Sequence, residues 1–427
     1  MEHCTHTYNI HVQHIARSAY ARLKMLSAAS PVVLVRGPRQ SGKSTLVREL
    51  MQELGTQATY LNLDDVQLLS ALTMDAYGLL KGLPQQTIIL DEVQRLPEVT
   101  LAIKRLVDER RTPGRFILTG SADILQLPRL ADSLAGRMTL LDLWPLSQRE
   151  LAQTAGNFVD GAFNAGFTPL STLSVSRADL AARIVRGGFP EPCTHPEWSD
   201  TVRKAWNDAY ISTLLGRDVR DIAQINKLHA LPTLLSIIAA RAGSEVNVND
   251  IAKSIGLSNT TTAEYINLLR LMYLVVSVPS WSRANLTKRL VKSPKLFMAD
   301  SGLMSHLIYA DAARFQVDGV AFGSALENFV AGELLKEIAT SDTQPTLWHM
   351  RDSAGTEVDF VLERGPFVVG IDVKATSNPG ARDFAGLRAL QTITGKQFVR
   401  GILLYTGEQV LPHGDDIMAL PLSALWA

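Results

Sequence analysis

The stretch Val32-Val-Leu-Val-Arg-Gly37-Pro-Arg-Gln-Ser-Gly42-Lys43-Ser44-Thr45 decides the fold of the first third of this chain. An apolar run is followed by two glycines that bracket a polar loop, and helical spacing then begins at Thr45 and continues to Leu54. Glycine lets a backbone curl so that successive N–H groups face one centre, and a helix N-terminus adds positive partial charge. The pattern predicts a phosphate-binding loop. The residues expected around the nucleotide are Gly37, Pro38, Arg39, Gln40, Ser41, Gly42, Lys43, Ser44 and Thr45.

Two acids downstream strengthen this interpretation. The apolar run Thr87–Leu90 ends in Asp91 and Glu92. We expect Lys43 to contact the β- and γ-phosphates, and Ser44 and Asp91 to hold Mg²⁺. Glu92 is expected to polarise the attacking water as a general base. The sequence therefore predicts an enzyme that binds ATP with Mg²⁺ and hydrolyses it.

Short apolar runs recur through the same region without strict alternation of apolar and polar residues. Runs rich in Val, Ile and Leu are typical of strands in a parallel sheet that is covered on both faces. The segments between them are long enough for crossover helices, so an α/β domain is expected. Its five predicted strands are Val32–Val35, Thr59–Leu63, Thr87–Leu90, Phe116–Leu118 and Met138–Leu143.

Two further features bear on catalysis. Thr119, at the end of the fourth run, is the first choice for a residue that senses the γ-phosphate or the water, with Ser121 second. A simple turn is the alternative. Arg137 lies just before the fifth run, with Arg129 as the alternate. An arginine here can stabilise the transition state in a neighbouring subunit, and an ordinary ion pair is the competing interpretation.

The segment 248–271 has the spacing of a helix-turn-helix. A helix from Val248 is followed by Gly256, and Ser258 caps a second helix that runs from Asn259 to Leu271. Such folds bind DNA or protein, and the start of the second helix carries no Lys or Arg for reading bases. A basic stretch follows that would lie near phosphates. It consists of Arg283, Lys288, Arg289, Lys292 and Lys295.

Near the C-terminus, carboxylates collect around one lysine. Asp372 and Lys374 lie two residues apart, so both side chains emerge on one face of a strand. Asp359 joins them if its strand forms a hairpin with theirs near Gly365, and Glu327 lies on a preceding helix. Converging carboxylates and a lysine suit a divalent metal and phosphodiester cleavage. Ion pairs on half-exposed strands are the alternative, and spacing alone favours them.

Length, charge and cysteine content limit the kinds of function that this protein can have. The chain has 427 residues, enough for several domains, and Lys plus Arg equals Asp plus Glu at 42 each. Net charge therefore gives no global attraction to nucleic acid. Two cysteines, no secretory start and no apolar run that could span a membrane indicate a cytoplasmic protein.

A group of histidines near the start matches no standard zinc spacing, so we interpret this segment as a polar N-terminal segment rather than as a metal site. It comprises His3, His6, His11 and His14 beside Cys4.

Taken together, the motifs resemble a family of prokaryotic AAA-type ATPases whose C-terminal domain has no characterised function. In that family a winged helix lies between the ATPase core and a domain similar to the PD-(D/E)XK nuclease fold. The resemblance extends from about residue 15 to the C-terminus. It is carried by Gly37–Thr45, Leu90–Gln94, Leu118–Ser121, Ser133–Arg137, Pro145–Ser147, Gly187–Glu191, Pro294–Leu303, Glu327–Asn328, Glu357–Phe360 and Ile371–Lys374.

The resemblance implies further residue roles. It places Pro190 near the nucleotide base, and it maps Glu327, Asp359, Asp372 and Lys374 onto the acidic positions and the lysine of the nuclease fold. One departure concerns Asp372, where the family often has Glu. The shorter side chain would shift or weaken metal binding.

The expected fold class is α/β, in five parts: an N-terminal segment (1–20), a P-loop ATPase core (21–145), a helical lid (146–243), a winged helix (244–300) and a nuclease-like α/β domain (301–427). The main functional hypothesis is a homo-oligomeric ATPase that couples its nucleotide state to an activity on DNA or other nucleic acid. A nucleotide-dependent switch or scaffold that binds protein is the first alternative. Metal-dependent nuclease activity is the second.

Overall fold

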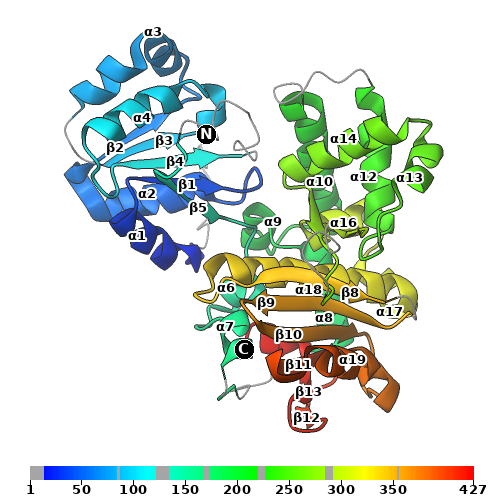
Figure 1. Ribbon diagram of the computed structural model, residues 1–427. Helices are drawn as coiled ribbons and strands as arrows, with labels where there is room; N and C mark the ends of the chain where they lie inside the picture. The colour runs from blue at the N-terminus through cyan, green and yellow to red at the C-terminus, as the bar shows by residue number, and fades with distance from the viewer. Residues whose placement is uncertain are drawn as a thin grey trace, which may run out of the picture.

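A computed structural model describes residues 14–83, 87–121, 134–164, 166–167, 173–219, 227–283, 292–352 and 355–427. It contains a parallel sheet with helices on both faces, a group of helices beside it, and a second sheet along which the long helix α18 lies (Figure 1). His3, Cys4, His6 and His11 lie outside the described residues, as do Arg129, Lys288 and Arg289.

The first sheet has the strand order β2-β3-β4-β1-β5, and every pair of neighbours is parallel. The predicted five-stranded parallel sheet is therefore confirmed, with strand ends that differ by one or two residues from the expected ones. The strands are β1 Val32–Arg36, β2 Ala58–Asn62, β3 Thr87–Asp91, β4 Phe116–Gly120 and β5 Met138–Asp142.

Helices cover this sheet on both faces. Alternate residues of β1 pack into two apolar clusters: Val33 and Val35 lie with α1 and α2, whereas Val32 and Leu34 lie with α3 and α4. Burial on both faces is the reason why the strand sequence shows no alternation. The helices are α1 Ala19–Ala29, α2 Lys43–Leu54, α3 Val66–Gly82 and α4 Val99–Glu109.

A largely helical region follows the first sheet. Its helices are α6 Gln148–Ala152, α7 Phe158–Phe163, α8 Arg177–Arg186, α9 Pro190–Thr194, α10 Asp200–Thr213, α12 Leu231–Ala240, α13 Val248–Ile255, α14 Asn259–Leu271, α16 Ser301–Leu307, α17 Ala312–Val317 and α18 Gly319–Thr340. Helices α13 and α14 have the predicted bounds. Gly256 takes the left-handed conformation between them, at φ 67°, and Ser258 Oγ accepts from Thr261 N at 3.1 Å. Strands β6 Val275–Val278 and β7 Lys295–Met298 then form an antiparallel pair.

The second sheet has the order β12-β13-β11-β10-β9-β8. Strands β9 and β10 form the predicted antiparallel hairpin, and β10 pairs in parallel with β11 across helix α19 Ala385–Thr394. The strands are β8 Thr346–Arg351, β9 Glu357–Arg364, β10 Phe367–Lys374, β11 Phe398–Tyr405, β12 Leu411–Pro412 and β13 Ile417–Pro421.

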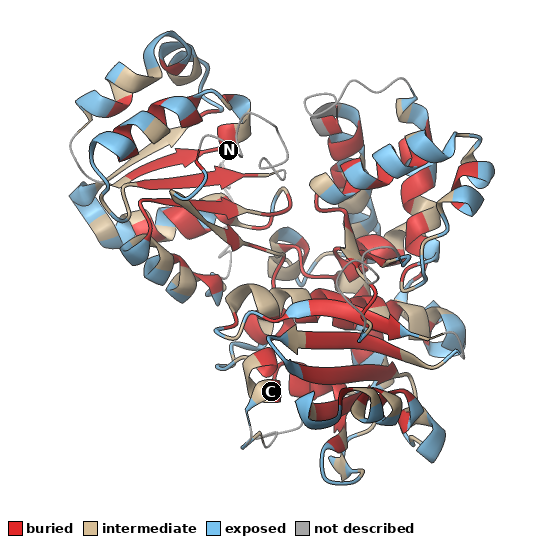
Figure 2. Cartoon of the chain, viewed as in Figure 1, coloured by how far each residue is buried: buried red, intermediate tan, exposed pale blue. Residues whose placement is uncertain are grey.

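One apolar core unites the helical region with the second sheet. Among the described residues it runs from Phe158 to Trp426 and includes side chains of α8, α12, α14, α18 and β10. The two apolar clusters of the first sheet are formed separately from it, by residues between Ala19 and Leu143. Buried side chains accordingly concentrate in the two sheets and in the packed faces of the helices (Figure 2). The chain thus has two bodies: a phosphate-loop body and a C-terminal body.

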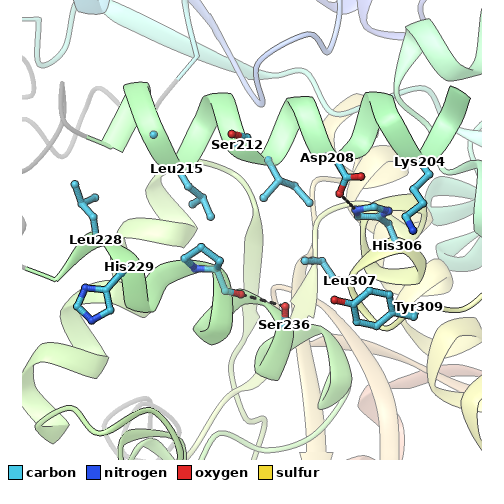
Figure 3. A pocket seen from close by; sticks show the side chains of 13 residues that line it. Lys204, Asp208, Ser212, Leu215, Leu228, His229, Ser236, His306, Leu307 and Tyr309 are labelled. Carbon is cyan, nitrogen blue, oxygen red and sulfur yellow. Dashed lines mark hydrogen bonds and ion pairs between the residues drawn. The ribbon is translucent and has the colours of Figure 1, made fainter. Parts of the chain in front are cut away.

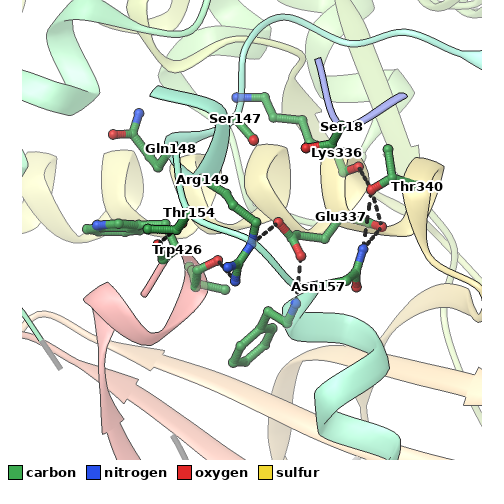
Figure 4. Close-up of polar contacts among 12 residues, drawn as sticks. Ser18, Ser147, Gln148, Arg149, Thr154, Asn157, Lys336, Glu337, Thr340 and Trp426 are labelled. Carbon is green, nitrogen blue, oxygen red and sulfur yellow. Dashed lines mark hydrogen bonds and ion pairs between the residues drawn. The ribbon is translucent and has the colours of Figure 1, made fainter. Parts of the chain in front are cut away.

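Polar groups fill the junction between these two bodies, around α6 (Figure 4). The backbone N of Gln148 donates to Glu333 Oε2 at 2.7 Å, and Arg149 Nε pairs with Glu337 Oε1 at 3.1 Å. Lys336 Nζ donates to the carbonyl of Leu146 at 3.0 Å. All three partners on the second body belong to α18, so the segment that follows β5 packs against this helix.

Candidate functional site

The predicted phosphate loop connects the end of β1 to the start of α2. Gly42 has φ 95° and Gln40 has φ 60°, so the backbone curls through left-handed conformations. A Cβ atom at Gly37 would collide with the backbone carbonyl of Leu143. Glycine is therefore required at 37 by close packing and at 42 by backbone conformation. Helix α2 begins at Lys43, two residues earlier than the sequence suggested, and Ser44 and Thr45 lie in its first turn.

The side chain of Lys43 is buried inside this loop. Its Nζ donates to the carbonyls of Gly37 at 3.1 Å and Pro38 at 2.7 Å. Burial lowers the pKa of Lys43 from 10.5 to about 8, although the negative charges of Glu92 and Asp91 oppose the shift. The ammonium group, the loop and the two acids therefore share one electrostatic environment.

Asp91 lies at the carboxyl end of β3 and is held by two hydroxyl groups. Tyr60 donates to one carboxylate oxygen and Thr119 donates to the other. Burial raises the pKa of Tyr60 to about 12, and the bond to Asp91 acts in the same direction. Asp91 is thus kept as an acceptor at the sheet edge where the phosphate loop begins.

Glu92 follows in a left-handed conformation, at φ 62°, which is rare for a residue with a side chain. Its backbone N–H donates to Thr119 Oγ1 at 3.0 Å. Gln94 donates to the Glu92 carboxylate and also to Ser121 Oγ, at 2.9 Å in the latter case. Strained conformations of this kind cluster at functional sites, because the surroundings must enforce them.

These contacts distinguish the two residues that the sequence offered as sensors, Thr119 and Ser121. Thr119 is fully buried and bonds to both Asp91 and the backbone of Glu92, so it positions the acid pair. Ser121 lies beside the Glu92 side chain, with its Oγ 3.5 Å from Oε2. Tyr60 and Gln94 complete the arrangement. Gln94 ends the stretch Leu90–Gln94 that carries the family resemblance, whereas no motif in the sequence points to Tyr60.

Arg137 lies at the opposite edge of the sheet. It precedes Met138, which pairs with Val32 at the start of β1, whereas the phosphate loop leaves the far end of that strand. The guanidinium makes two hydrogen bonds to Asp108 of α4, at 2.6 and 3.0 Å. This geometry separates Arg137 from the phosphate loop of the same chain, and the side chain forms an ion pair with Asp108.

The helical region reaches the phosphate loop through α9 and α10. A Cβ atom at Gly42 would lie 3.9 Å from Pro190 Cγ, which places Pro190 beside the loop. Tyr210 Oη donates to the carbonyl of Arg39 at 3.1 Å. Tyr210 also stacks on Trp206, with ring centroids 5.2 Å apart. Neither aromatic residue belongs to a motif that the sequence reveals.

A cavity of about 490 Å³ lies on another side of α10, between α10, α12 and α16 (Figure 3). His306 and Asp208 face each other there at 2.9 Å, and Tyr309 projects at the rim. None of the predicted site residues lines this cavity.

The structure brings the C-terminal carboxylates close together, in contacts that include ion pairs with lysines. Asp359 Oδ2 accepts from the backbone N of Val373 at 2.8 Å, and Lys374 Nζ donates to Asp372 Oδ1 at 2.9 Å. Burial and the adjacent charge of Asp359 raise the pKa of Asp372 well above its usual range. Burial alone would raise the pKa of Asp359, but a hydrogen bond from Asp372 and the charges of two lysines lower it overall.

A lysine ammonium group lies at the centre of this cluster. The sequence pattern predicted the position of this lysine wrongly. Lys295 is 2% exposed, and its Nζ lies 2.8 Å from Glu327, 2.6 Å from Glu357 and 3.6 Å from Asp359. Its expected place in a basic stretch near phosphates was wrong, because β7 carries the side chain into the second sheet. Arg283 likewise donates to the carbonyl of Ile393 on the C-terminal body, at 2.9 Å.

The Lys295 ammonium is therefore a cation that these carboxylates contact directly. Burial would lower its pKa, but the charges of Glu327 and Asp359 raise it. Burial and the charge of Asp359 also raise the pKa of Glu327, to about 7, despite the contact with Lys295. Within the described residues, no group of three or more His, Cys, Asp or Glu side chains is arranged to hold a metal ion. Those same residues also include no helix that is both long and apolar enough to cross a membrane.

Comparison with known proteins divides the chain into three matches. Residues 29–152 match a family described as an AAA domain, and residues 177–314 and 322–425 match two domains of unknown function, DUF8612 and DUF4143. The first match includes the phosphate loop and the acid pair, and it supports an AAA-type ATPase domain in this part of the chain.

Two relatives align with most of this chain. The uncharacterized proteins Mb2031c of Mycobacterium bovis and Rv2008c of Mycobacterium tuberculosis are each 28% identical over 95% of this chain and 83% of their own length. A Walker-type ATPase of Pyrococcus abyssi, PABY2304, overlaps 69% of this chain and 96% of its own, with 14% identity and a TM-score of 0.43. That likeness is too distant to assign a function.

The lowered pKa of Lys43 predicts that nucleotide binding is coupled to proton uptake. Phosphate groups favour the charged ammonium, whereas the nucleotide-free site releases its proton near pH 8. Apparent ATP affinity should therefore fall about tenfold between pH 7 and pH 9. Calorimetry at pH 8 in buffers of different ionisation enthalpy should detect protons taken up. Binding without proton exchange would contradict this assignment.

The Lys295 cluster predicts a pH-dependent loss of stability. Lys295→Met leaves Glu327, Glu357 and Asp359 without their buried cation and should lower the unfolding free energy by about 3–5 kcal/mol. Because the pKa of Glu327 is raised from 4.5 to about 7, its contribution to stability is present below pH 4.5 and is lost as the pH rises through 7. The difference from wild type should therefore be larger at pH 8 than at pH 5 in urea unfolding. Lys374→Met, at a side chain that is 34% exposed, should cost less at both pH values.

Proposed function

We propose that this protein binds ATP with Mg²⁺ and hydrolyses it at the phosphate loop. The observation that supports this most directly is the acid pair, since Thr119 binds both Asp91 and the backbone of Glu92 at the end of β3. Both acids lie close enough to Lys43 to influence its pKa. The Ser44 hydroxyl and the Asp91 carboxylate are the hard oxygen donors that Mg²⁺ prefers, so the donor set fits this ion.

In this proposal each residue has a defined task. Backbone N–H groups from Gly37 to Ser44 and the N-terminus of α2 bind the phosphates, and Lys43 adds a positive charge. Mg²⁺ supplies neutralisation of the developing charge when it is bound. Glu92 orients the attacking water and accepts its proton, with its side chain held by Gln94. Ser121 and Thr119 would report the state of the acid pair, while Pro190 and Tyr210 border the loop from the helical region.

Assembly into a homo-oligomer would give Arg137 a catalytic task. Its side chain is 26% exposed and lies at the sheet edge away from its own phosphate loop. From that edge it would contact the nucleotide of a neighbouring copy after release from Asp108, as arginine fingers in trans do.

A nucleic-acid-associated activity in the cytoplasm is the second proposal for this chain. Helices α13 and α14, the β6–β7 pair and the bridge between Glu245 and Lys295 support a winged helix. Lys292, just before β7, is exposed and donates to the carbonyl of Arg351 at 3.4 Å, whereas the exposed face of α14 carries both Glu264 and Arg270. A switch or scaffold that binds protein through the same surface is the competing proposal, because that face has no net positive charge.

The nuclease-like interpretation of residues 301–427 is supported by the sheet and by the convergence of Glu327, Asp359, Asp372 and Lys374. Metal-dependent cleavage stays outside the proposed function, because the ammonium of Lys295 lies among the carboxylates that would bind the metal.

Two substitutions test hydrolysis. Glu92→Gln should lower kcat about 10²–10⁴-fold while ATP still binds, because only the proton acceptor is removed. Lys43→Ala should abolish detectable binding. Glu109→Gln, at an exposed carboxylate of α4, is the matched control and should behave as wild type. Equal turnover in Glu92→Gln, Lys43→Ala and wild type would exclude catalysis at this site.

The nucleic-acid proposal predicts salt-sensitive binding of duplex DNA that stimulates ATP turnover. Replacing Lys288, Arg289 and Lys292 by neutral residues should make the DNA affinity depend less steeply on salt. The magnitude of the slope of log K against log salt should fall by about 0.9 for each phosphate contact that is lost. Neutralising Lys81, Lys104 and Arg105 on α3 and α4 is the control with the same change of charge. A slope unaffected by the first set would favour the protein-binding alternative.

A further inference from the structure

We propose that Arg17 is a positioning residue for nucleotide binding and that it links the phosphate loop to the C-terminal body through Glu150. This inference rests on the proposed ATP-binding function. Arg17 precedes α1 and lies outside the residues 29–152 that match the AAA domain.

The guanidinium of Arg17 joins three separate parts of the chain. Its Nη1 donates to the carbonyl of Ser41 at 2.6 Å, and its Nη2 donates to the carbonyl of Trp144 at 2.7 Å. Its Nε pairs with Glu150 Oε1 at 3.0 Å, and the Arg17 and Glu150 side chains are 8% and 6% exposed. The same carboxylate oxygen accepts from the backbone N of Ser18 at 2.8 Å. Five donors in one rigid plane allow an arginine to make such divergent contacts, which a lysine cannot reproduce.

The bond to Ser41 has a direct consequence for phosphate binding. In a planar trans peptide the carbonyl and the following N–H point in opposite directions. Because Arg17 holds the Ser41 carbonyl on its own side, the N–H of Gly42 is directed to the opposite side of that peptide. This N–H belongs to the last peptide before α2, where phosphate groups are bound in loops of this type. Arg17 therefore fixes the orientation of a phosphate donor without touching the nucleotide.

The packing around Gly42 supports the same assignment. A Cβ atom at position 42 would lie 3.1 Å from Arg17 Nη1, so the guanidinium fills the space that a side chain would take. Arg17 also adds a positive charge behind the loop, although the Glu150 carboxylate balances it.

Glu150 extends the connection to the second body. It forms a capping box with Ser147: Ser147 N donates to Glu150 Oε2 at 2.9 Å, and Glu150 N donates to Ser147 Oγ at 3.1 Å. Two other residues of the same short helix, Gln148 and Arg149, bind Glu333 and Glu337 of α18. Figure 4 shows the second of these contacts, between Arg149 and Glu337. A shift of the Ser41 carbonyl is therefore opposed by α6 and α18, and displacement of α18 would release the loop. Such coupling is reciprocal by thermodynamic necessity.

The test compares two arginines that both contact parts of the chain distant in sequence. Arg17→Ala removes the loop contact, whereas Arg22→Ala on α1 removes contacts with Ser341 and Asp342 of the C-terminal body only. We expect the ADP dissociation constant of Arg17→Ala to rise about tenfold, the equivalent of one well-oriented hydrogen bond. Arg22→Ala should bind ADP as wild type does, and Arg17→Lys should recover part of the affinity.

Amide hydrogen exchange gives a second readout that does not depend on turnover. In the nucleotide-free protein, Arg17→Ala should speed exchange at residues 37–44, and added ADP should protect residues 145–150 in wild type and Arg22→Ala but not in Arg17→Ala. Glu150→Gln, which keeps the shape of the side chain, should weaken the same protection and serves if Arg17→Ala does not fold.

The outcomes separate the two proposals. Wild type that fails to bind nucleotide would overturn the proposed function. Wild type that binds, with Arg17→Ala and Glu150→Gln unchanged in affinity and exchange, would overturn the role of Arg17 alone.

Discussion

The relative placement of the two bodies depends on buried charges rather than on a shared apolar core. Among the described residues, the apolar clusters of the first sheet and the core from Phe158 to Trp426 form separately, and α6 lies between them. There Arg149 and Glu337 are 5% and 4% exposed. Apolar contacts are tolerant of small shifts, whereas a buried ion pair requires one geometry, because a misplaced charge loses both solvent and partner. The junction therefore specifies an orientation more strongly than it adds stability.

The same principle explains the acidic cluster of the second sheet. Glu327, Glu357 and Asp359 are partly shielded from water and would repel one another without a cation, and Lys295 supplies that cation from β7. Soon after β7 comes Asp300, whose carboxylate accepts from the backbone N of Gly188 at 2.8 Å. Gly188 is two residues before Pro190, which borders the phosphate loop. The hydrogen bond between Gly188 and Asp300 therefore ties the segment that borders the phosphate loop to the N-cap residue of α16.

The sequence predicted those parts of the molecule that depend mainly on residues close together in the chain. The phosphate loop needs glycine at 37 and 42, and strands buried on both faces show as unbroken apolar runs, so β1 to β5 could be placed within one or two residues. The acid pair followed from its position at a strand end. The hairpin of β9 and β10 followed from two apolar runs flanking Gly365.

Buried charges escaped prediction because nothing in their local sequence distinguishes them from solvated ones. Lys295 resembles the other cations of its segment, yet its partner Glu327 lies 32 residues away. Arg17 is an isolated arginine in a polar segment, and its partner Glu150 lies 133 residues away. Desolvating an arginine or a lysine is unfavourable until the fold brings its partner into contact, so only the assembled structure reveals which charge is buried. In this protein the contacts of Arg17 join the phosphate loop to α6, and this connection is a property of the tertiary structure that no single motif contains.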